Sequence, residues 1–193
     1  MTRNAVLLMD LQRDFLGEEG ARMPVQPSGA AAVIRTANAI LRQAMLGGAL
    51  PVLVVNRFLP TDRIGNFFRK GAAIDGTPGA EIDPRIAAHE DVKTFAKARP
   101  SAFTNPELDE FLAARGITDL YVIGVFAEGC VRSTALDAKR RGYAVHVLAD
   151  AVASDAAWKK RLALWVMARA GVEVIGGEEG SPAAEHMRDA SGQ

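Results

Sequence analysis

Short apolar runs alternate with longer helical patterns along this chain, and that alternation constrains the fold more than any other feature. The first run, residues 5–9, is continuously apolar, as expected for a strand buried on both faces. Parallel strands need long crossover connections, usually helices, so the pattern predicts a three-layer α/β/α sandwich around a mainly parallel, Rossmann-like sheet. Further runs complete an expected six-stranded sheet: residues 51–56, 91–97, 120–125, 144–150 and 172–175.

The chain is long enough for one sizeable core, because it has 193 residues of which 49% are hydrophobic. We therefore expect a single domain over residues 1–193. Residues 57–91 are rich in Gly, Pro and Asp and too long for a simple connector, so we interpret them as a lid-like segment. The composition of the tail, about residues 177–193, predicts a flexible end.

Charge and hydropathy narrow the possible partners. Lys plus Arg equals Asp plus Glu at 23 each, without a long basic run, so neither nucleic acid nor a membrane is an expected partner. The N-terminus lacks the pattern of a cleaved leader, and no run reaches the roughly 18 apolar residues that span a bilayer. These features predict a cytoplasmic protein. The single cysteine excludes an internal disulfide.

Three side chains with useful chemistry fall at the ends of predicted strands. Asp10 follows the first strand, Lys97 ends the third, and Cys130 begins the helix expected after the fourth. Open parallel sheets bind ligands beyond the carboxyl ends of their strands, so these groups are expected to share one crevice. A helix N-terminus and the nearby Lys97 would favour a Cys130 thiolate. Taken singly, the residues also fit ordinary roles as a turn cap, a surface charge and a small core side chain.

The histidines offer no better base. His146 lies inside the fifth predicted strand, His186 lies in the tail, and His89 lies beside two acidic residues in a predicted turn. A carboxylate base with a lysine partner is therefore the economical arrangement.

Three stretches carry a family resemblance: VLLMDLQRDFL with Asp10, KARPSAF with Lys97, and GVFAEGCVRSTALDAKRRGYAVHVLADA with Cys130. On these stretches the chain resembles the isochorismatase-like cysteine hydrolases, which include nicotinamidases, N-carbamoylsarcosine amidohydrolases and ureidoacrylate amidohydrolases. The resemblance covers about residues 5–175. It implies an isochorismatase-like fold and hydrolysis of carbon–nitrogen bonds other than peptide bonds.

The resemblance also implies a Cys-Asp-Lys triad. Cys130 would attack a small amide or carbamoyl compound, Asp10 would pass the thiol proton to departing ammonia, and Lys97 would hold both charges in place. Water would then hydrolyse the thioester. The family also has a non-proline cis peptide bond, here Val125–Phe126, and the N–H groups of Phe126 and Cys130 would form an oxyanion hole.

One departure separates this chain from nicotinamidases. Those enzymes carry metal-binding histidines after the second strand, whereas this chain reads NRFLPTDRIGNFFRKG there, without a histidine. We therefore expect no metal and no cofactor, and we do not expect nicotinamidase activity. Two alternatives stay open: an isochorismatase-type vinyl-ether hydrolase, and a non-catalytic or redox-sensing binding protein in which Cys130 is a sensor thiol.

Several residues are candidates for substrate binding, and each has a structural alternative. Aromatic rings could cover a planar substrate or fasten the irregular segment to the body. Arginines could bind a substrate carboxylate or remain solvated, and a glutamine could line the pocket or form a turn. The candidates are Gln12, Phe15, Phe58, Arg99 and Arg132, with Phe67 and Phe68 as further rings.

The last predicted helix, about residues 155–170, carries an apolar stripe of Leu162, Trp165 and Val166, with Trp158 seven residues before Trp165. The stripe fits core packing or an oligomer surface better than a cofactor site. Members of the resembled family commonly form dimers or tetramers. We therefore expect a homodimer or homotetramer whose other partner is a small-molecule substrate.

Overall fold

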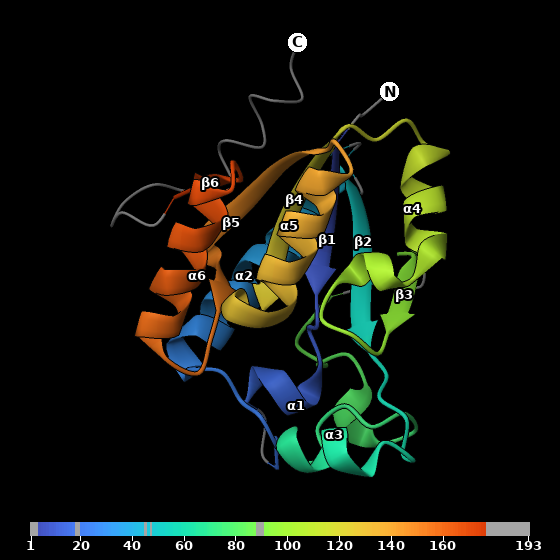
Figure 1. The fold of residues 1–193 in the computed structure, drawn as a ribbon, viewed down its shortest axis with the longest axis vertical. Coiled ribbons are helices and arrows are strands. Elements are labelled where there is room, and N and C mark those ends of the chain that lie inside the picture. Colours follow the sequence, from blue (N-terminus) through green and yellow to red (C-terminus); the bar gives the residue numbers. More distant parts are fainter. Residues whose placement is uncertain (1–3, 18–19, 45, 47, 88–90, 177–193) are drawn as a thin grey trace.

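The computed structural model describes residues 4–17, 20–44, 46, 48–87 and 91–176, and it contains a six-stranded sheet with parallel pairing throughout. The strand order β3-β2-β1-β4-β5-β6 starts in the middle and winds outward in both directions (Figure 1). This order confirms the predicted α/β class, with a wholly parallel sheet in place of a mainly parallel one. The strands are β1 (Asn4–Met9), β2 (Leu50–Asn56), β3 (Thr94–Lys97), β4 (Asp119–Val125), β5 (Ala144–Ala153) and β6 (Glu173–Ile175).

Helices cover both faces of the sheet. In Figure 1, α2 (Pro27–Ala44) lies behind the sheet and α5 (Arg132–Arg140) lies in front of it. None of the described helices is long and apolar enough to cross a membrane. The tail at residues 177–193 lies outside the described residues. The other helical elements are α1 (Arg13–Leu16), α3 (Arg63–Phe68), α4 (Pro106–Ala113), α6 (Ala157–Arg169), the 3-10 turns η1 (Pro78–Ala80) and η2 (Ala102–Thr104), and the π-helical turn η3 (Ala127–Val131).

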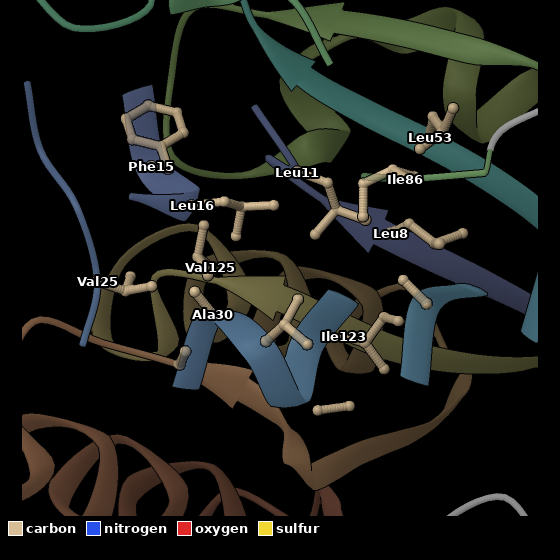
Figure 2. Close-up of a cluster of buried hydrophobic side chains, with 14 of the residues drawn as sticks. Leu8, Leu11, Phe15, Leu16, Val25, Ala30, Leu53, Ile86, Ile123 and Val125 are labelled. Carbon is tan, nitrogen blue, oxygen red and sulfur yellow. The ribbon is translucent and has the colours of Figure 1, made fainter. Parts of the chain in front are cut away.

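The residues of β1 divide between two hydrophobic clusters, one on each face of the sheet. Val6 and Leu8 pack with side chains of α2, whereas Ala5, Leu7 and Met9 pack with side chains of α4, α5 and α6. Successive side chains of a strand point to opposite faces, so a strand covered on both sides is apolar at every position. Figure 2 shows part of the first cluster, where side chains of β1, α1, α2 and β4 meet.

The lid-like segment expected at residues 57–91 is attached to the body near its end. Ile82 forms an antiparallel bridge with Gln12, and the N–H of Asp83 donates to the carbonyl of Leu11 at 2.9 Å. The segment also contains α3 and η1, which the sequence pattern did not predict. Figure 1 shows α1 and α3 beyond the tips of β1 and β2, at the edge where a parallel sheet binds ligands.

Gly124, near the end of β4, faces β1 at close range. Its φ is 115°, and an added Cβ would come within 2.1 Å of the Met9 carbonyl oxygen. Gly124→Ala should therefore lower the free energy of unfolding by about 3 kcal/mol or more, because backbone would have to move. Gly142→Ala is the matched control: φ is 92°, but the added Cβ meets no described atom within 4 Å, so a loss of about 1 kcal/mol is expected. Urea denaturation measures both losses, and equal values would contradict the steric explanation.

Candidate active site

Asp10 is the first residue after β1 and adopts the left-handed conformation, with a φ of 55°. Its N–H donates to the Val54 carbonyl at 2.8 Å, and its carbonyl accepts from the N–H of Gln12 at 2.8 Å. A non-glycine residue in this conformation costs about 1–3 kcal/mol, and such residues cluster at functional sites. The side chain of Asp10 has no exposed surface, so this turn places a carboxylate inside the protein.

Lys97 and Asn56 end neighbouring strands and are paired in register. The Lys97 ammonium donates to Asp10 Oδ2 at 3.0 Å and to Asn56 Oδ1 at 2.7 Å. Its third contact is Cys130 Sγ at 3.2 Å, and Asn56 Nδ2 lies 3.8 Å from the same sulfur. An ammonium has three N–H donors, so each of them has one partner here. The ammonium thus brings the carboxylate, the amide and the thiol into one connected group.

Cys130 lies in the turn between β4 and α5. The sequence predicted that this residue begins a helix, but α5 begins at Arg132 and Cys130 belongs to the π-helical turn η3 before it. The Val125–Phe126 peptide bond just before this turn is cis, as the resemblance implies. The thiol-bearing residue is partly exposed, whereas Asp10 is fully buried. Cys130 is therefore the least buried residue of this group.

Burial dominates the protonation of this site. It raises the pKa of Asp10, against the opposing charge of Lys97. Burial by itself lowers the pKa of Lys97, but the electrostatic and hydrogen-bond interactions with Asp10 and Cys130 outweigh it and the pKa is raised. Burial, with the charge of Asp10 acting in the same direction, raises the pKa of Cys130 to about 12. The expectation of a resting thiolate was wrong, because burial and a neighbouring carboxylate outweigh the lysine.

The alkylation rate of Cys130 should report this raised pKa. With a pKa of about 12 the thiolate is scarce at neutral pH, so iodoacetamide should modify Cys130 about tenfold or more slowly than free cysteine. The rate should keep rising as the pH passes 9.0, the ordinary pKa of the thiol. Mass spectrometry over a pH series measures the rate, and the single cysteine makes the modified site unambiguous. Fast alkylation at mildly acidic pH would contradict a raised pKa of Cys130.

The aromatic candidates make local packing contacts. Phe15 is buried and packs edge-on against Phe126, with ring centroids 5.6 Å apart. The guanidinium of Arg69 lies over the ring of Phe58, 3.9 Å from its centroid. These contacts match the alternative in which the rings fasten neighbouring segments to one another.

The polar candidates differ in whether their side chains have partners within the protein. Arg99 is exposed and Arg132 is half-buried, and neither side chain has a hydrogen-bond or ion-pair partner among the described residues. Both guanidinium groups are therefore available to a ligand. Gln12 is fully buried, and both N–H groups of its amide are taken by backbone carbonyls, so it offers no free donor to a substrate. Phe67 and Phe68, at 79% and 77% exposed, lie on the surface of α3.

Asn56 also belongs to the group around the Lys97 ammonium, although the sequence pattern did not single it out. It is buried at the end of β2, where it contacts both Lys97 and Cys130. The signal was present, because a polar side chain ends an apolar strand here just as Lys97 does at the end of β3. Asparagine is common in turns, so its place after an apolar run did not by itself indicate a site.

The residues after β2 do not fit a metal site. The first of them is Arg57, whose guanidinium pairs with Asp75 at 3.3 Å and with Glu81 at 2.9 Å. Within the described part of the chain, no group of three or more His, Cys, Asp or Glu side chains could hold a metal ion. His89 and His186 lie outside that part. The carboxylates of Asp75 and Glu81 near β2 are therefore paired with the guanidinium of Arg57. The chemistry proposed below uses no metal.

A parallel α/β fold with a thiol, a carboxylate and an ammonium in contact at the carboxyl edge of its sheet belongs to the class of proteins that bind ligands at that edge. Comparison with known protein families shows to which family within that class the chain belongs. The chain belongs to the isochorismatase family, because the model of the isochorismatase domain matches residues 4–179.

Similar proteins support this assignment. The chain is 34% identical over 160 residues to a protein of Arabidopsis thaliana named probable inactive nicotinamidase, covering 78% of this chain and 80% of that protein. It is 30% identical over 185 residues to nicotinamidase/pyrazinamidase of Mycobacterium tuberculosis, covering 89% and 97%. The solved structure of pyrazinamidase of Pyrococcus horikoshii in complex with zinc is similar, with a TM-score of 0.80, 31% identity, and coverage of 91% of this chain and 100% of that one.

Proposed function

We propose that this protein hydrolyses the C–N bond of a small amide or carbamoyl compound, using Cys130 as a covalent nucleophile. The observation that carries the proposal is the position of the Lys97 ammonium, 3.0 Å from Asp10 and 3.2 Å from Cys130. Burying the charge of a lysine is costly unless well-placed partners compensate it, and the partners of Lys97 here include the carboxylate and the thiol that the proposed reaction needs.

The raised pKa of Cys130 determines the form of the first step. A thiol with a pKa of about 12 must lose its proton as it attacks, and Asp10, whose own pKa is raised, is the base suited to take it. The sulfur bonds to the carbonyl carbon, the C–N bond then breaks, and the proton held by Asp10 goes to the departing ammonia. Water then cleaves the thioester to give the acid and free thiol. Lys97 stays charged throughout and stabilises both anions.

The oxyanion of the tetrahedral intermediate needs donors of its own. We assign this role to the backbone N–H groups of Phe126 and Cys130, which lie in the turn between β4 and α5. Donors of this kind are worth several kcal/mol when they are preorganised, about 10²–10³ in kcat for one of them. Arg99 and Arg132 are free to bind an acidic group of the substrate.

The amide class is favoured over the other two possibilities. Two of the similar proteins described above are named nicotinamidase/pyrazinamidase and pyrazinamidase, and both names denote enzymes that hydrolyse amides. A sensor thiol needs neither a buried base nor a buried ammonium, and hydrolysis of a vinyl ether does not need a nucleophilic sulfur. Nicotinamide itself is a less favoured substrate, because Arg57 and its two carboxylates occupy the region after β2.

Ammonia release from a panel of amides and carbamoyl compounds tests the proposal. Intact mass spectrometry of the quenched reaction should show an acyl group on the protein, which hydroxylamine removes. Vinyl ethers of the isochorismate type form a second arm of the panel. Turnover of vinyl ethers alone, or turnover of amides without any acylated protein, would contradict the proposal.

The exposed face of α6 supports self-association. Trp158, Leu162 and Trp165 follow one side of this helix and are 59%, 50% and 58% exposed. Such a stripe fits burial against a second copy of the chain better than permanent contact with water. Trp158→Glu with Trp165→Glu should convert a homodimer or homotetramer to a smaller species while leaving the thermal unfolding of the protomer cooperative. Light scattering coupled to gel filtration measures the mass of the assembly. An unchanged mass would contradict the proposal that this face of α6 forms the contact between copies of the chain.

The single-domain organisation over residues 1–193 and the cytoplasmic location remain predictions from the sequence.

A further inference from the structure

We infer that Asn56 is a further catalytic residue and that Gln12 is its positioning residue. The inference rests on the proposed function, because it concerns the same sulfur. The juxtaposition behind it is specific: the side chain of Asn56 contacts Lys97 and Cys130, and the backbone of Asn56 is held at both its N–H and its C=O by Gln12.

The two ends of the Asn56 amide have different partners. Its oxygen accepts from the Lys97 ammonium at 2.7 Å, and its nitrogen lies 3.8 Å from Cys130 Sγ. Because Lys97 is a donor only, it fixes which end of the amide faces the ammonium and leaves the NH₂ group toward the sulfur. A hydrogen bond from this group strengthens as negative charge builds up on the sulfur. Asn56 therefore gives the attacking thiolate a second donor beside Lys97.

Gln12 holds the backbone from which Asn56 projects. Its Oε1 accepts from the N–H of Asn56 at 2.8 Å, and its Nε2 donates to the Asn56 carbonyl at 2.8 Å. The same Nε2 donates to the Ala80 carbonyl at 2.6 Å, which attaches the 57–91 segment to this point. Gln12 has no exposed surface, so loss of its amide would leave the N–H and C=O of Asn56 buried without these partners. The end of β2 is thus held from the turn that carries Asp10.

A purely structural role for Gln12 makes a different prediction from a positioning role. Asn38 provides the matched comparison, because its amide also holds a backbone segment from both ends: it donates to the Arg85 carbonyl and accepts from the N–H of Ala87, both at 2.8 Å. Asn38 lies on α2, outside the site described above. Loss of either amide should lower thermal stability, but only loss of Gln12 should change the chemistry of Cys130.

The test compares Asn56→Ala, Gln12→Met and Asn38→Leu by three readouts: kcat and KM for the best amide of the panel, the pH dependence of Cys130 alkylation by iodoacetamide, and the melting temperature. Asn56→Ala should lower kcat about 10- to 100-fold, as expected for loss of a hydrogen bond to a charged group, and should move the alkylation profile to higher pH. Gln12→Met should lower kcat about tenfold with KM little changed, and move the profile in the same direction. Asn38→Leu should lower the melting temperature alone.

Combining the variants separates positioning from an independent effect. Because Gln12 acts through Asn56, the Gln12→Met and Asn56→Ala double variant should lose no more kcat than Asn56→Ala. Gln12→Glu, which keeps the acceptor but loses the donors, takes the place of Gln12→Met if the latter does not fold. Fully additive losses, or an unchanged alkylation profile in Asn56→Ala, would overturn the inference. The alkylation readout needs no substrate, so it decides the roles of Asn56 and Gln12 even if no amide in the panel is hydrolysed.

Discussion

Replacement of Cys130 with Ala is expected to reduce amide hydrolysis by a factor of about 10⁴ or more, because the chain has no other thiol for the covalent step. The single cysteine of the chain makes this loss unambiguous. Cys130→Ser should keep a small residual rate, since a hydroxyl next to Asp10 and Lys97 is a poorer nucleophile in the same position. The acyl adduct should disappear from the mass spectrum of Cys130→Ala.

The stability of the Cys130 variants provides the control for this prediction. The residue is partly exposed, and Lys97 retains its bonds to Asp10 and Asn56 when the sulfur is removed. The melting temperature of Cys130→Ala should therefore stay close to that of the wild type. Turnover at the wild-type rate by a folded Cys130→Ala protein would refute nucleophilic catalysis and would favour a binding or sensing role.

Lys97→Met should cause the largest loss of stability among the site variants. Asp10 and Lys97 form an ion pair with no exposed side-chain surface, so removal of the lysine leaves a buried carboxylate without a counter-charge. Breaking a buried pair in this way costs about 3–5 kcal/mol. Asp10→Asn in the same chain removes the remaining charge, so the double variant should recover most of the loss. Urea denaturation of the three proteins at neutral pH measures these differences.

The pH dependence of the Lys97→Met deficit follows from the pKa of Asp10. In the wild type the folded-state pKa is already raised above 3.8 by burial, and loss of Lys97 raises it further. A raised folded-state pKa favours the neutral carboxyl, so the stability it supports is fully present below the unfolded pKa and is lost as pH rises through the folded pKa. The deficit should therefore shrink as the pH is lowered from about 7 toward 3.8, the ordinary pKa of the carboxyl. An equal deficit at both pH values would show that lost packing, and not the unpaired charge, causes it.

The layer architecture could be read from the sequence because it depends on periodicity. The continuous apolar run of β1 indicated a strand covered on both faces, and its residues do divide between two clusters. Polar residues at strand ends likewise indicated the edge where Asp10, Lys97 and Cys130 meet. By contrast, α3 and the attachment of Ile82 to Gln12 were not predicted, because they depend on contacts between distant segments rather than on a repeating pattern.

The role proposed for Gln12 and the protonation state of Cys130 could not be predicted from the sequence. A glutamine two residues after Asp10 fits a pocket lining or a turn equally well until its partners at Asn56 and Ala80 are known. A cysteine before a helix suggests a thiolate, whereas the burial and the charge of Asp10 around this one favour the thiol.

The sequence by itself determined the parallel α/β class and the three residues to which we assign the chemistry, since apolar periodicity and residue type are local properties of the chain. Only the tertiary structure decided which hydrogen bonds Asn56 and Gln12 make and which way the pKa of Cys130 moves. Those properties depend on desolvation and on charges contributed by strands that lie far apart in the sequence.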